Sequence, residues 1–258
     1  RRGDLRYITN WVKGKYYGNG FLARALDITN NIPMPSRGYV IVSRFRQATG
    51  CAPDEGQYRL LRDLVDEKLS LDDARVAQAG EIVTRFLDTG LADYPGDSFL
   101  DRFNALFEAM VAQVVALNRR ALEERELNIL VFPQGTRSRR LSQGHTGLAQ
   151  MTQHLSVPIV PVGCNGSDKL HSGNVPLSGG GRVVYRIGPP LEVDGPELAP
   201  YRVPPEVPPL TRAARTYDDR YRAITEVVMG RINALLDPEY QFAPDAASDG
   251  VQGVARFL

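Results

Sequence analysis

Hydrophobic positions in the first 46 residues predict two short strands and one helix. Residues 38–42 read Gly-Tyr-Val-Ile-Val, a continuous β-branched run that begins at glycine, and such a run is typical of a buried strand. Residues 5–8 predict a shorter strand. Residues 21–26 have the spacing of a helix, which must end before Pro33 because the residue preceding a proline avoids the helical region.

The spacing of apolar residues changes between residues 47 and 126. Asp54, Ser70, Asp97 and Ser98 in this segment are residue types that cap helix N-termini. The segment therefore predicts three or four amphipathic helices. The apolar residues recur three and four positions apart, as on one helix face, at Leu60, Leu61, Leu64, Val65, Ile82, Val83, Phe86, Leu87, Phe103, Leu106, Phe107, Met110, Val111 and Val114.

A strand, a loop, a helix and a second strand follow one another between residues 127 and 162. Residues 127–132 and 157–162 are short apolar runs, and residues 147–154 have helical spacing. Strands joined through a helix usually lie in one parallel or mixed sheet, and residues 182–187 predict a further strand. The expected fold class is α/β, with a mixed, largely parallel sheet flanked by helices.

These patterns suggest four parts. Residues 1–190 are expected to form the main domain, with residues 47–126 as a helical insertion. Proline is frequent in residues 191–210, which predicts an extended connection on the surface. Residues 211–238 contain an amphipathic helix that ends at Asp237-Pro238, and residues 239–258 form a tail whose composition favours disorder.

Composition excludes several classes of protein. The chain has 258 residues and a formal net charge of +1, so no global cationic field favours nucleic-acid binding. Its two cysteines are far apart in sequence, which argues against a zinc or disulfide framework and favours a reducing compartment. No run of about 18 apolar residues is present, so no membrane-spanning segment is expected.

The strongest candidate for chemistry is the polar sequence Phe-Pro-Gln-Gly-Thr-Arg-Ser at residues 132–138. It follows a predicted strand and precedes a helix, which is where open α/β sheets bind ligands. Gly135 allows backbone amides to approach a ligand, and Arg137 offers a planar guanidinium suited to phosphate, with Arg139 and Arg140 behind it. The residues indicate an anion site, and the alternative is a polar turn with a solvated basic run.

The sequence from 132 to 138, with Val-Pro-Ile-Val-Pro-Val at 157–162, resembles the third and fourth sequence blocks of the glycerol-3-phosphate and lysophosphatidic acid acyltransferases. The third block of that family usually reads Phe-Pro-Glu-Gly-Thr-Arg-Ser, so six of seven positions match. The resemblance implies acyl transfer from an acyl-CoA or acyl-ACP thioester to a glycerol-phosphate or lysophosphatidic acid hydroxyl, without metal or other cofactor. The substrate-binding residues it implies are Phe132, Pro133, Gln134, Gly135, Thr136, Arg137 and Ser138.

A looser similarity lies upstream, at residues 31–38, which resemble the family's second block. The arginine of that block helps to hold the acceptor phosphate, so the resemblance implies that Arg37 is a partner of Arg137. The alternative is that Arg37 is an ordinary turn arginine.

Two departures from the family pattern affect the expected activity. Gln134 replaces the usual glutamate, which keeps the hydrogen-bonding reach but removes the charge. The family's catalytic block is His, four residues, then Asp, whereas the three histidines here are followed five positions later by Gln150, Ile159 and Pro176. We expect the block upstream of Arg1, lost by truncation, and the fragment to be inactive alone. His145 is a weaker catalytic candidate.

An aromatic and basic stretch suggests where the protein acts. Trp11, Tyr16, Tyr17 and Phe21 alternate with Lys13, Lys15 and Arg24, which suits an interfacial element at lipid headgroups. The resemblance favours this membrane contact, and the expected location is peripheral, on the cytoplasmic face of a membrane. The alternative is a partly buried aromatic cluster. Two other functions stay open: a non-catalytic relative that binds lipid phosphate, and a nucleotide-binding enzyme that uses Gly18 and Gly20.

Overall fold

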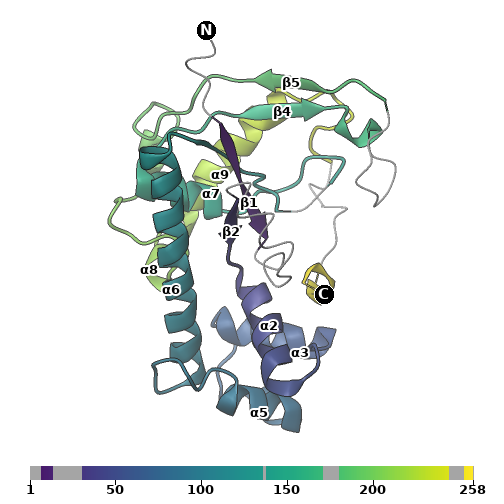
Figure 1. Cartoon of the computed structure of the whole chain (residues 1–258), viewed down its shortest axis with the longest axis vertical. Helices are drawn as coiled ribbons and strands as arrows, with labels where there is room; N and C mark the ends of the chain where they lie inside the picture. Colours follow the sequence, from purple (N-terminus) through teal and green to yellow (C-terminus); the bar gives the residue numbers. More distant parts are fainter. Residues whose placement is uncertain (1–6, 14–30, 136–137, 171–179, 244–252, 258) are drawn as a thin grey trace. The chain divides into compact units, whose positions relative to one another are not determined.

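The computed structural model describes residues 7–13, 31–135, 138–170, 180–243 and 253–257. Figure 1 shows the whole chain, coloured along the sequence. The chain divides into two compact units, one of residues 1–131 and 251–258 and one of residues 132–250. The predicted helix at residues 21–26 lies outside the described residues.

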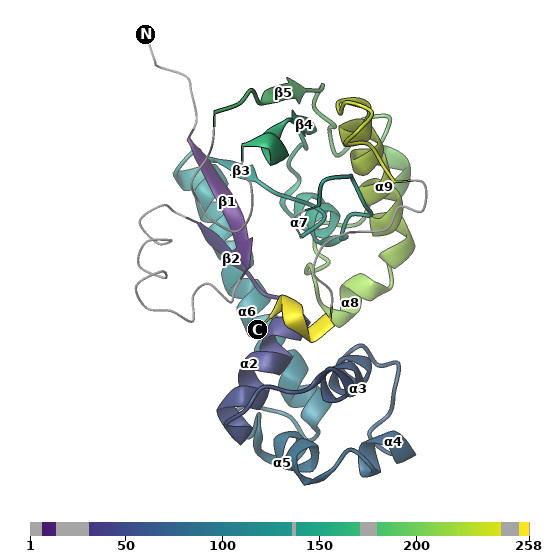
Figure 2. The same ribbon diagram turned by 90° about the vertical axis from the view of Figure 1, so that its right-hand side faces the viewer.

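The first unit contains a small parallel sheet. Its strands are β1 (Ile8–Lys13), β2 (Ile32–Met34) and β3 (Asn128–Leu130), in the order β2-β1-β3, with β1 in the centre (Figure 2). Ile8 pairs with Asn128 and Trp11 pairs with Ile32. The strand predicted at 127–132 is confirmed, whereas the strand predicted at 5–8 begins only at its last residue. Helices and a small parallel sheet together are consistent with an α/β fold.

The strand predicted at residues 38–42 is wrong, because these residues lie in helix α2 (Arg37–Thr49). Ser36 begins the helix by accepting a hydrogen bond from the Tyr39 amide, and Gly50 ends it at a φ of 81°. Ile41 and Phe45 are four positions apart and fully buried, so the run fits one helix face as well as a strand. The N-cap and the burial of this face outweigh the β-propensity of Val40, Ile41 and Val42.

The amphipathic helices predicted in the next segment are confirmed. They are α3 (Glu55–Val65), α4 (Ala74–Ala77), α5 (Glu81–Thr89) and α6 (Phe99–Arg119), and a π-helical turn, Arg120–Glu124, extends α6. Aromatic rings form the centre of their core, with successive centroids 5.2–6.3 Å apart. The rings belong to Phe45, Phe86, Phe99, Phe103 and Phe107.

Two of the four predicted helix caps have complete capping boxes. Asp54 exchanges hydrogen bonds with Gln57, and Ser98 does the same with Asp101. Ser70 instead accepts from the Asp72 amide in a short turn. Asp97 precedes the cap of α6 and does not form it.

Replacing Ser98 with alanine should therefore lower the free energy of unfolding by about 1 kcal/mol, since the first turn of α6 loses its cap. Ser70→Ala is the matched control, because its hydroxyl caps no helix. Urea denaturation of the two variants compares them directly. Equal losses from the two substitutions would contradict the assignment of the α6 cap.

The second unit begins after β3 and contains an antiparallel strand pair. The pair is β4 (Val162–Asn165) and β5 (Val184–Ile187), and the helices are α7 (Gly147–Leu155), α8 (Arg212–Arg215) and α9 (Asp218–Ala234). Short 3-10 turns lie at Ser167–Lys169 and Ala199–Tyr201. The helix predicted at 147–154, the strand at 182–187 and the helix before Pro238 are confirmed.

The second strand of the predicted βαβ unit is displaced. Residues 157–161 contribute one bridge, from Ile159 to Leu191, and β4 begins at Val162. Pro158 and Pro161 have no amide hydrogen, so this stretch cannot form a continuous ladder. Within the first unit β3 pairs with β1, and within the second unit β4 pairs with β5; a single sheet through 127–162 stays a prediction.

The proline-rich segment supplies core residues to the second unit. Leu191, Leu198 and Val203 are fully buried against α7 and α9. Gln150 and Gln153 of α7 accept hydrogen bonds from the Leu210 and Val203 amides. The expectation of a surface connection is wrong for these side chains, because the prolines alternate with apolar residues that pack inward.

Residues after α9 are described in two pieces. Tyr240 is buried in the second unit. In the first unit, the Val254 amide donates to the Glu55 carboxylate at 3.0 Å, and the Phe257 ring lies 5.9 Å from that of Tyr58. Residues 244–252, also part of the predicted tail, lie outside the described residues.

Candidate anion-binding site

The polar sequence found above lies in a loop between β3 and α7, which we call the motif loop (residues 132–145). The Gly135 amide donates to the Phe132 carbonyl at 3.0 Å and closes a turn. Gly135 has a φ of 64°, in the left-handed region that glycine adopts without strain. The His145 amide donates to the Pro133 carbonyl at 2.8 Å, so the start and the end of the loop are held together.

Gln134 and Ser138 fix the inside of the motif loop. The Gln134 Nε2 donates to Ser142 Oγ at 2.9 Å and to the Arg140 carbonyl at 3.4 Å. The Ser138 hydroxyl donates to the same carbonyl at 2.6 Å. An ionised glutamate, the usual residue at this position of the motif, cannot donate a hydrogen bond to the Arg140 carbonyl. Gln134 makes this bond and so stabilises the loop.

The two arginines after Ser138 bind groups of the protein. Arg139 lies 3.5 Å from the Asp168 carboxylate and 3.7 Å from that of Glu239. Arg140 donates to the backbone carbonyls of Gln241 and Phe242 at 3.2 and 3.3 Å. The sequence placed both behind Arg137 in the expected anion site, and the structure shows that they contact carboxylates and carbonyls of the protein.

The predicted pair of phosphate ligands stays a prediction. Thr136 and Arg137 lie outside the described residues. Arg37 belongs to the first unit, where its side chain is 12% exposed. Its guanidinium donates to the Val65 carbonyl at 3.2 Å, lies 3.5 Å from Asp66 and covers the Phe107 ring at 5.4 Å.

The other sequence candidates occupy varied positions. Phe132 is 66% exposed, and Pro133 holds His145 through its backbone. His154 ends α7 with a buried Nδ1 atom that has no hydrogen-bond partner. His171 lies outside the described residues. Within the described ranges, no group of three or more His, Cys, Asp or Glu residues is placed to hold a metal ion.

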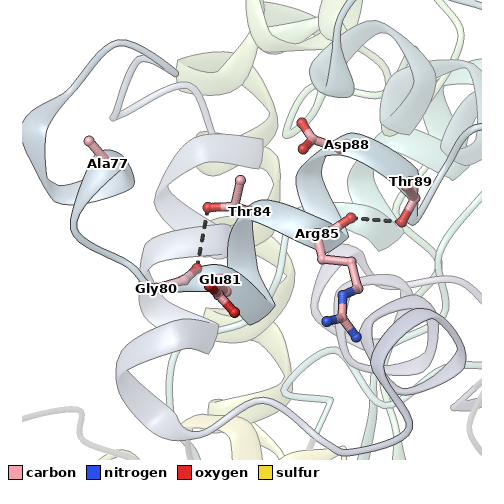
Figure 3. A pocket seen from close by; sticks show the side chains of 7 residues that line it. All are labelled: Ala77, Gly80, Glu81, Thr84, Arg85, Asp88 and Thr89. Carbon is pink, nitrogen blue, oxygen red and sulfur yellow. Dashed lines mark hydrogen bonds between the residues drawn. The ribbon is translucent and has the colours of Figure 1, made fainter.

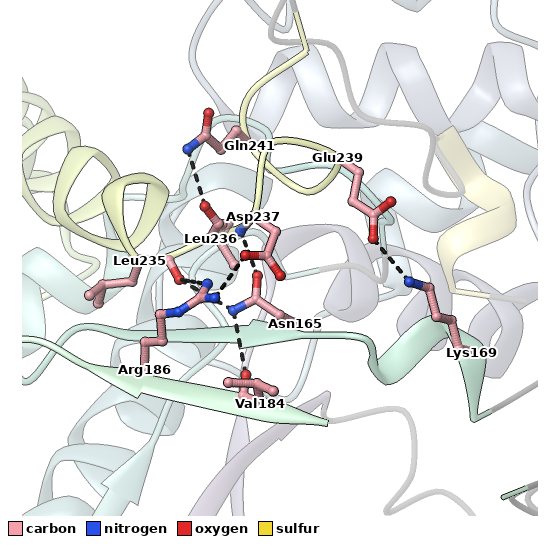
Figure 4. Close-up of polar contacts among 9 residues, drawn as sticks. All are labelled: Asn165, Lys169, Val184, Arg186, Leu235, Leu236, Asp237, Glu239 and Gln241. Carbon is pink, nitrogen blue, oxygen red and sulfur yellow. Dashed lines mark hydrogen bonds and ion pairs between the residues drawn. The ribbon is translucent and has the colours of Figure 1, made fainter. Parts of the chain in front are cut away.

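Two carboxylates beside the motif loop have lowered pKa values. The Tyr240 hydroxyl donates to Asp168 at 2.7 Å, and this hydrogen bond is the main cause that lowers the pKa of Asp168. Lys169 lies 3.1 Å from Glu239 (Figure 4) and is the main cause that lowers the pKa of Glu239, with smaller contributions from Tyr240 and Arg139. Local sequence spacing does not indicate these residues, because their contacts join positions about 70 apart.

These shifts predict a loss of stability in acid. A carboxylate whose pKa is lower in the folded state contributes stability above its ordinary pKa, here 4.5 for Glu239, and loses it as the pH falls through the lowered value. Glu239→Gln should therefore be less stable than the wild type at pH 7, and the difference should shrink below about pH 4.5. Denaturation at both pH values measures it. A difference that stays constant with pH would contradict the assignment.

Two hollows lie elsewhere, in the helical segment of the first unit. The larger, of about 600 Å³, is formed along α5 (Figure 3) by Ala77, Gly80, Glu81, Thr84, Arg85, Asp88 and Thr89. The two threonine hydroxyls that line it donate hydrogen bonds within the helix, from Thr84 to the Gly80 carbonyl and from Thr89 to the Arg85 carbonyl. The smaller lies between α3 and α4. Neither contains a candidate site residue.

The aromatic and basic stretch is described only in β1. The Trp11 indole donates to the Asn118 side chain at 2.8 Å, and Asn118 is fully buried on α6. This contact fits the partly buried alternative for Trp11, while Tyr16, Tyr17 and Phe21 lie outside the described residues. No described helix combines the length and the apolar character that crossing a membrane requires.

Comparison with known proteins places the motif loop within a recognised domain. A family model described as Acyltransferase matches residues 96–165, which include α6, β3, the motif loop, α7 and β4. No curated protein and no solved structure matches the chain. The match supports the acyltransferase superfamily and, in general terms, an acyltransferase activity.

Proposed function

We propose that the protein takes part in acyl transfer from an acyl-CoA or acyl-ACP thioester to a hydroxyl of glycerol phosphate or lysophosphatidic acid, in phospholipid biosynthesis. The observation that carries the proposal is the sequence at residues 132–138, which lies within the stretch that the Acyltransferase family model matches. Hydrogen bonds from Gln134 and Ser138 stabilise the loop that contains it. In this proposal the chain supplies the site for the acceptor phosphate.

Each residue of the motif loop has a distinct part in the proposal. Arg137 binds the phosphate through its guanidinium, which forms paired, charge-assisted hydrogen bonds with such oxyanions. Gly135 and Thr136 bring backbone amides and a hydroxyl to the same anion. Gln134 keeps the loop in shape from inside, through its hydrogen bonds to Ser142 and to the Arg140 carbonyl.

The acceptor chemistry also suggests where the protein works. A lysophospholipid stays in the membrane, so the enzyme must approach the headgroups from the water. We propose a peripheral position on the cytoplasmic face, with the aromatic and basic residues from Lys13 to Arg24 at the lipid surface.

A second candidate is a relative that binds lipid phosphate without transferring an acyl chain. It is favoured by the sequence itself, in which no histidine is followed by an acidic residue five positions later. An acyl-transfer assay on the protein separates the two. Labelled lysophosphatidic acid converted to phosphatidic acid supports the enzyme, and phosphate binding without conversion supports the relative.

Calorimetric titration with glycerol 3-phosphate tests the shared requirement of both candidates. The 258-residue chain should bind this ligand and should not bind glycerol, which differs only in lacking the phosphate. Equal heats for the two ligands, or none for either, would contradict the proposed function.

A further inference from the structure

We infer that residues 237–242, which we call the clamp, position the motif loop for binding the acceptor phosphate. The inference rests on the proposed function and adds positioning residues to it. The clamp follows α9 and lies outside the stretch that matches the acyltransferase family, so the family match does not assign it this part.

The clamp holds the motif loop through its backbone. The Leu141 amide donates to the Tyr240 carbonyl at 2.9 Å. The Arg140 guanidinium reaches the next two carbonyls, those of Gln241 and Phe242. Three successive residues of the clamp thus accept hydrogen bonds from two successive residues of the loop. Because Gln134 and Ser138 both donate to the Arg140 carbonyl, fixing Arg140 also fixes the start of the loop.

Side-chain charges form a second connection. Arg139 of the loop lies between the carboxylates of Asp168 and Glu239. Tyr240 donates to Asp168, and Lys169 pairs with Glu239. Asp168 therefore contacts both the loop, through Arg139, and the clamp, through Tyr240, while Glu239, which belongs to the clamp, contacts the loop directly through Arg139.

The clamp is itself anchored to the second unit. Asn165 of β4 donates to the Leu235 carbonyl and accepts from the Asp237 amide at 2.7 Å (Figure 4). Arg186 of β5 binds the same Leu235 carbonyl and pairs with Asp237 at 2.8 Å. Gln241 donates to the Leu236 carbonyl. These contacts fix the end of α9 on the strand pair, so the clamp rests on rigid elements.

Anion binding by a loop depends on such support. Backbone amides and a guanidinium bind phosphate strongly when they are already oriented, because ordering them on binding costs conformational entropy. The motif loop contains glycine and small polar residues, which restrict its conformation little. The clamp supplies the restriction from about 100 positions away in sequence.

Two charge-preserving variants test the inference without altering the charge of the site. Tyr240→Phe removes the hydroxyl that donates to Asp168. Arg140→Lys replaces the guanidinium, which donates to two backbone carbonyls, with a single ammonium group. Arg231→Lys is the matched control, since Arg231 pairs with Glu197 outside the loop and the clamp. Hydrogen exchange of the amides of residues 134–142 and calorimetry with glycerol 3-phosphate are measured for all three variants.

Both clamp variants should speed amide exchange in residues 134–142 by roughly tenfold. They should weaken glycerol 3-phosphate binding by about 2- to 10-fold. Arg231→Lys should change neither quantity. Unchanged exchange in the clamp variants would overturn the clamp, whatever the binding result.

The calorimetric measurements distinguish an error in the positioning role of the clamp from an error in the proposed function. If the wild type binds glycerol 3-phosphate and the clamp variants bind it equally well despite faster exchange, the positioning role is overturned and the proposed function stands. If the wild type does not bind the ligand, the proposed function fails, and with it the positioning role. Faster exchange together with weaker binding supports both.

Discussion

Arg137→Ala should weaken glycerol 3-phosphate binding by about 10- to 100-fold, since a hydrogen bond to a charged group contributes about 1.5–3 kcal/mol. The physical reason is that Arg139 and Arg140, the other arginines of the motif loop, are engaged with carboxylates and carbonyls of the protein. They cannot turn to the phosphate without releasing the loop. In an acyl-transfer assay the same substitution should reduce turnover mainly through acceptor binding.

The control for this experiment is Arg231→Ala, which removes the same charge from the second unit but lies outside the motif loop. A purely long-range effect of net charge would reduce binding equally in both variants. Calorimetry at one salt concentration compares them. Near-normal binding by the Arg137 variant would count decisively against the proposed acceptor site.

Phe86→Ala should lower the free energy of unfolding of the first unit by about 3–5 kcal/mol. Phe86 is fully buried, and its ring lies 5.2 Å from that of Phe45 and 5.3 Å from that of Phe99. Removing the ring leaves a cavity where α2, α5 and α6 meet, and the remaining rings cannot fill it without leaving their own contacts. A loss of this size approaches the total stability of many domains.

The control is Leu117→Ala, in the same unit, where the side chain is 39% exposed and its removal should change stability less. The chain has one tryptophan, Trp11, and it belongs to the first unit, so its fluorescence in urea reports the unfolding of that unit. Similar midpoints for Phe86→Ala and the wild type would show that the aromatic cluster is not the core of the unit.

Local hydrophobic spacing and capping residues predicted correctly those elements whose sequence is compatible with only one type of secondary structure. α3, α5 and α6 have long amphipathic spacing, and the first and last of these begin with capping boxes that the sequence displays. Residues 38–42 fit both a strand and a helix face, and the Ser36 cap and their burial with Phe45 decide for the helix. At residues 157–161 the apolar run favours a strand, but its two prolines cannot donate backbone hydrogen bonds. The segment therefore forms only one bridge, from Ile159 to Leu191.

The position of the candidate site in the chain could be predicted from the sequence, but the contacts that hold the motif loop in place could not. The Phe132–Ser138 sequence and the elements around it located the motif loop between a strand and a helix. Nothing near it indicated that Arg140 would bind carbonyls 101 and 102 positions later, or that Tyr240 would contact Asp168. Such contacts depend on how α9 packs, which local spacing does not encode.

The most direct test of the central claim is a map of backbone amide chemical shifts during titration with glycerol 3-phosphate. The proposed function predicts that the largest changes occur at Gly135, Ser138 and their neighbours in the motif loop, and that glycerol at the same concentration produces none. Changes centred elsewhere in the chain, with the amides of residues 132–145 unmoved at saturation, would contradict it.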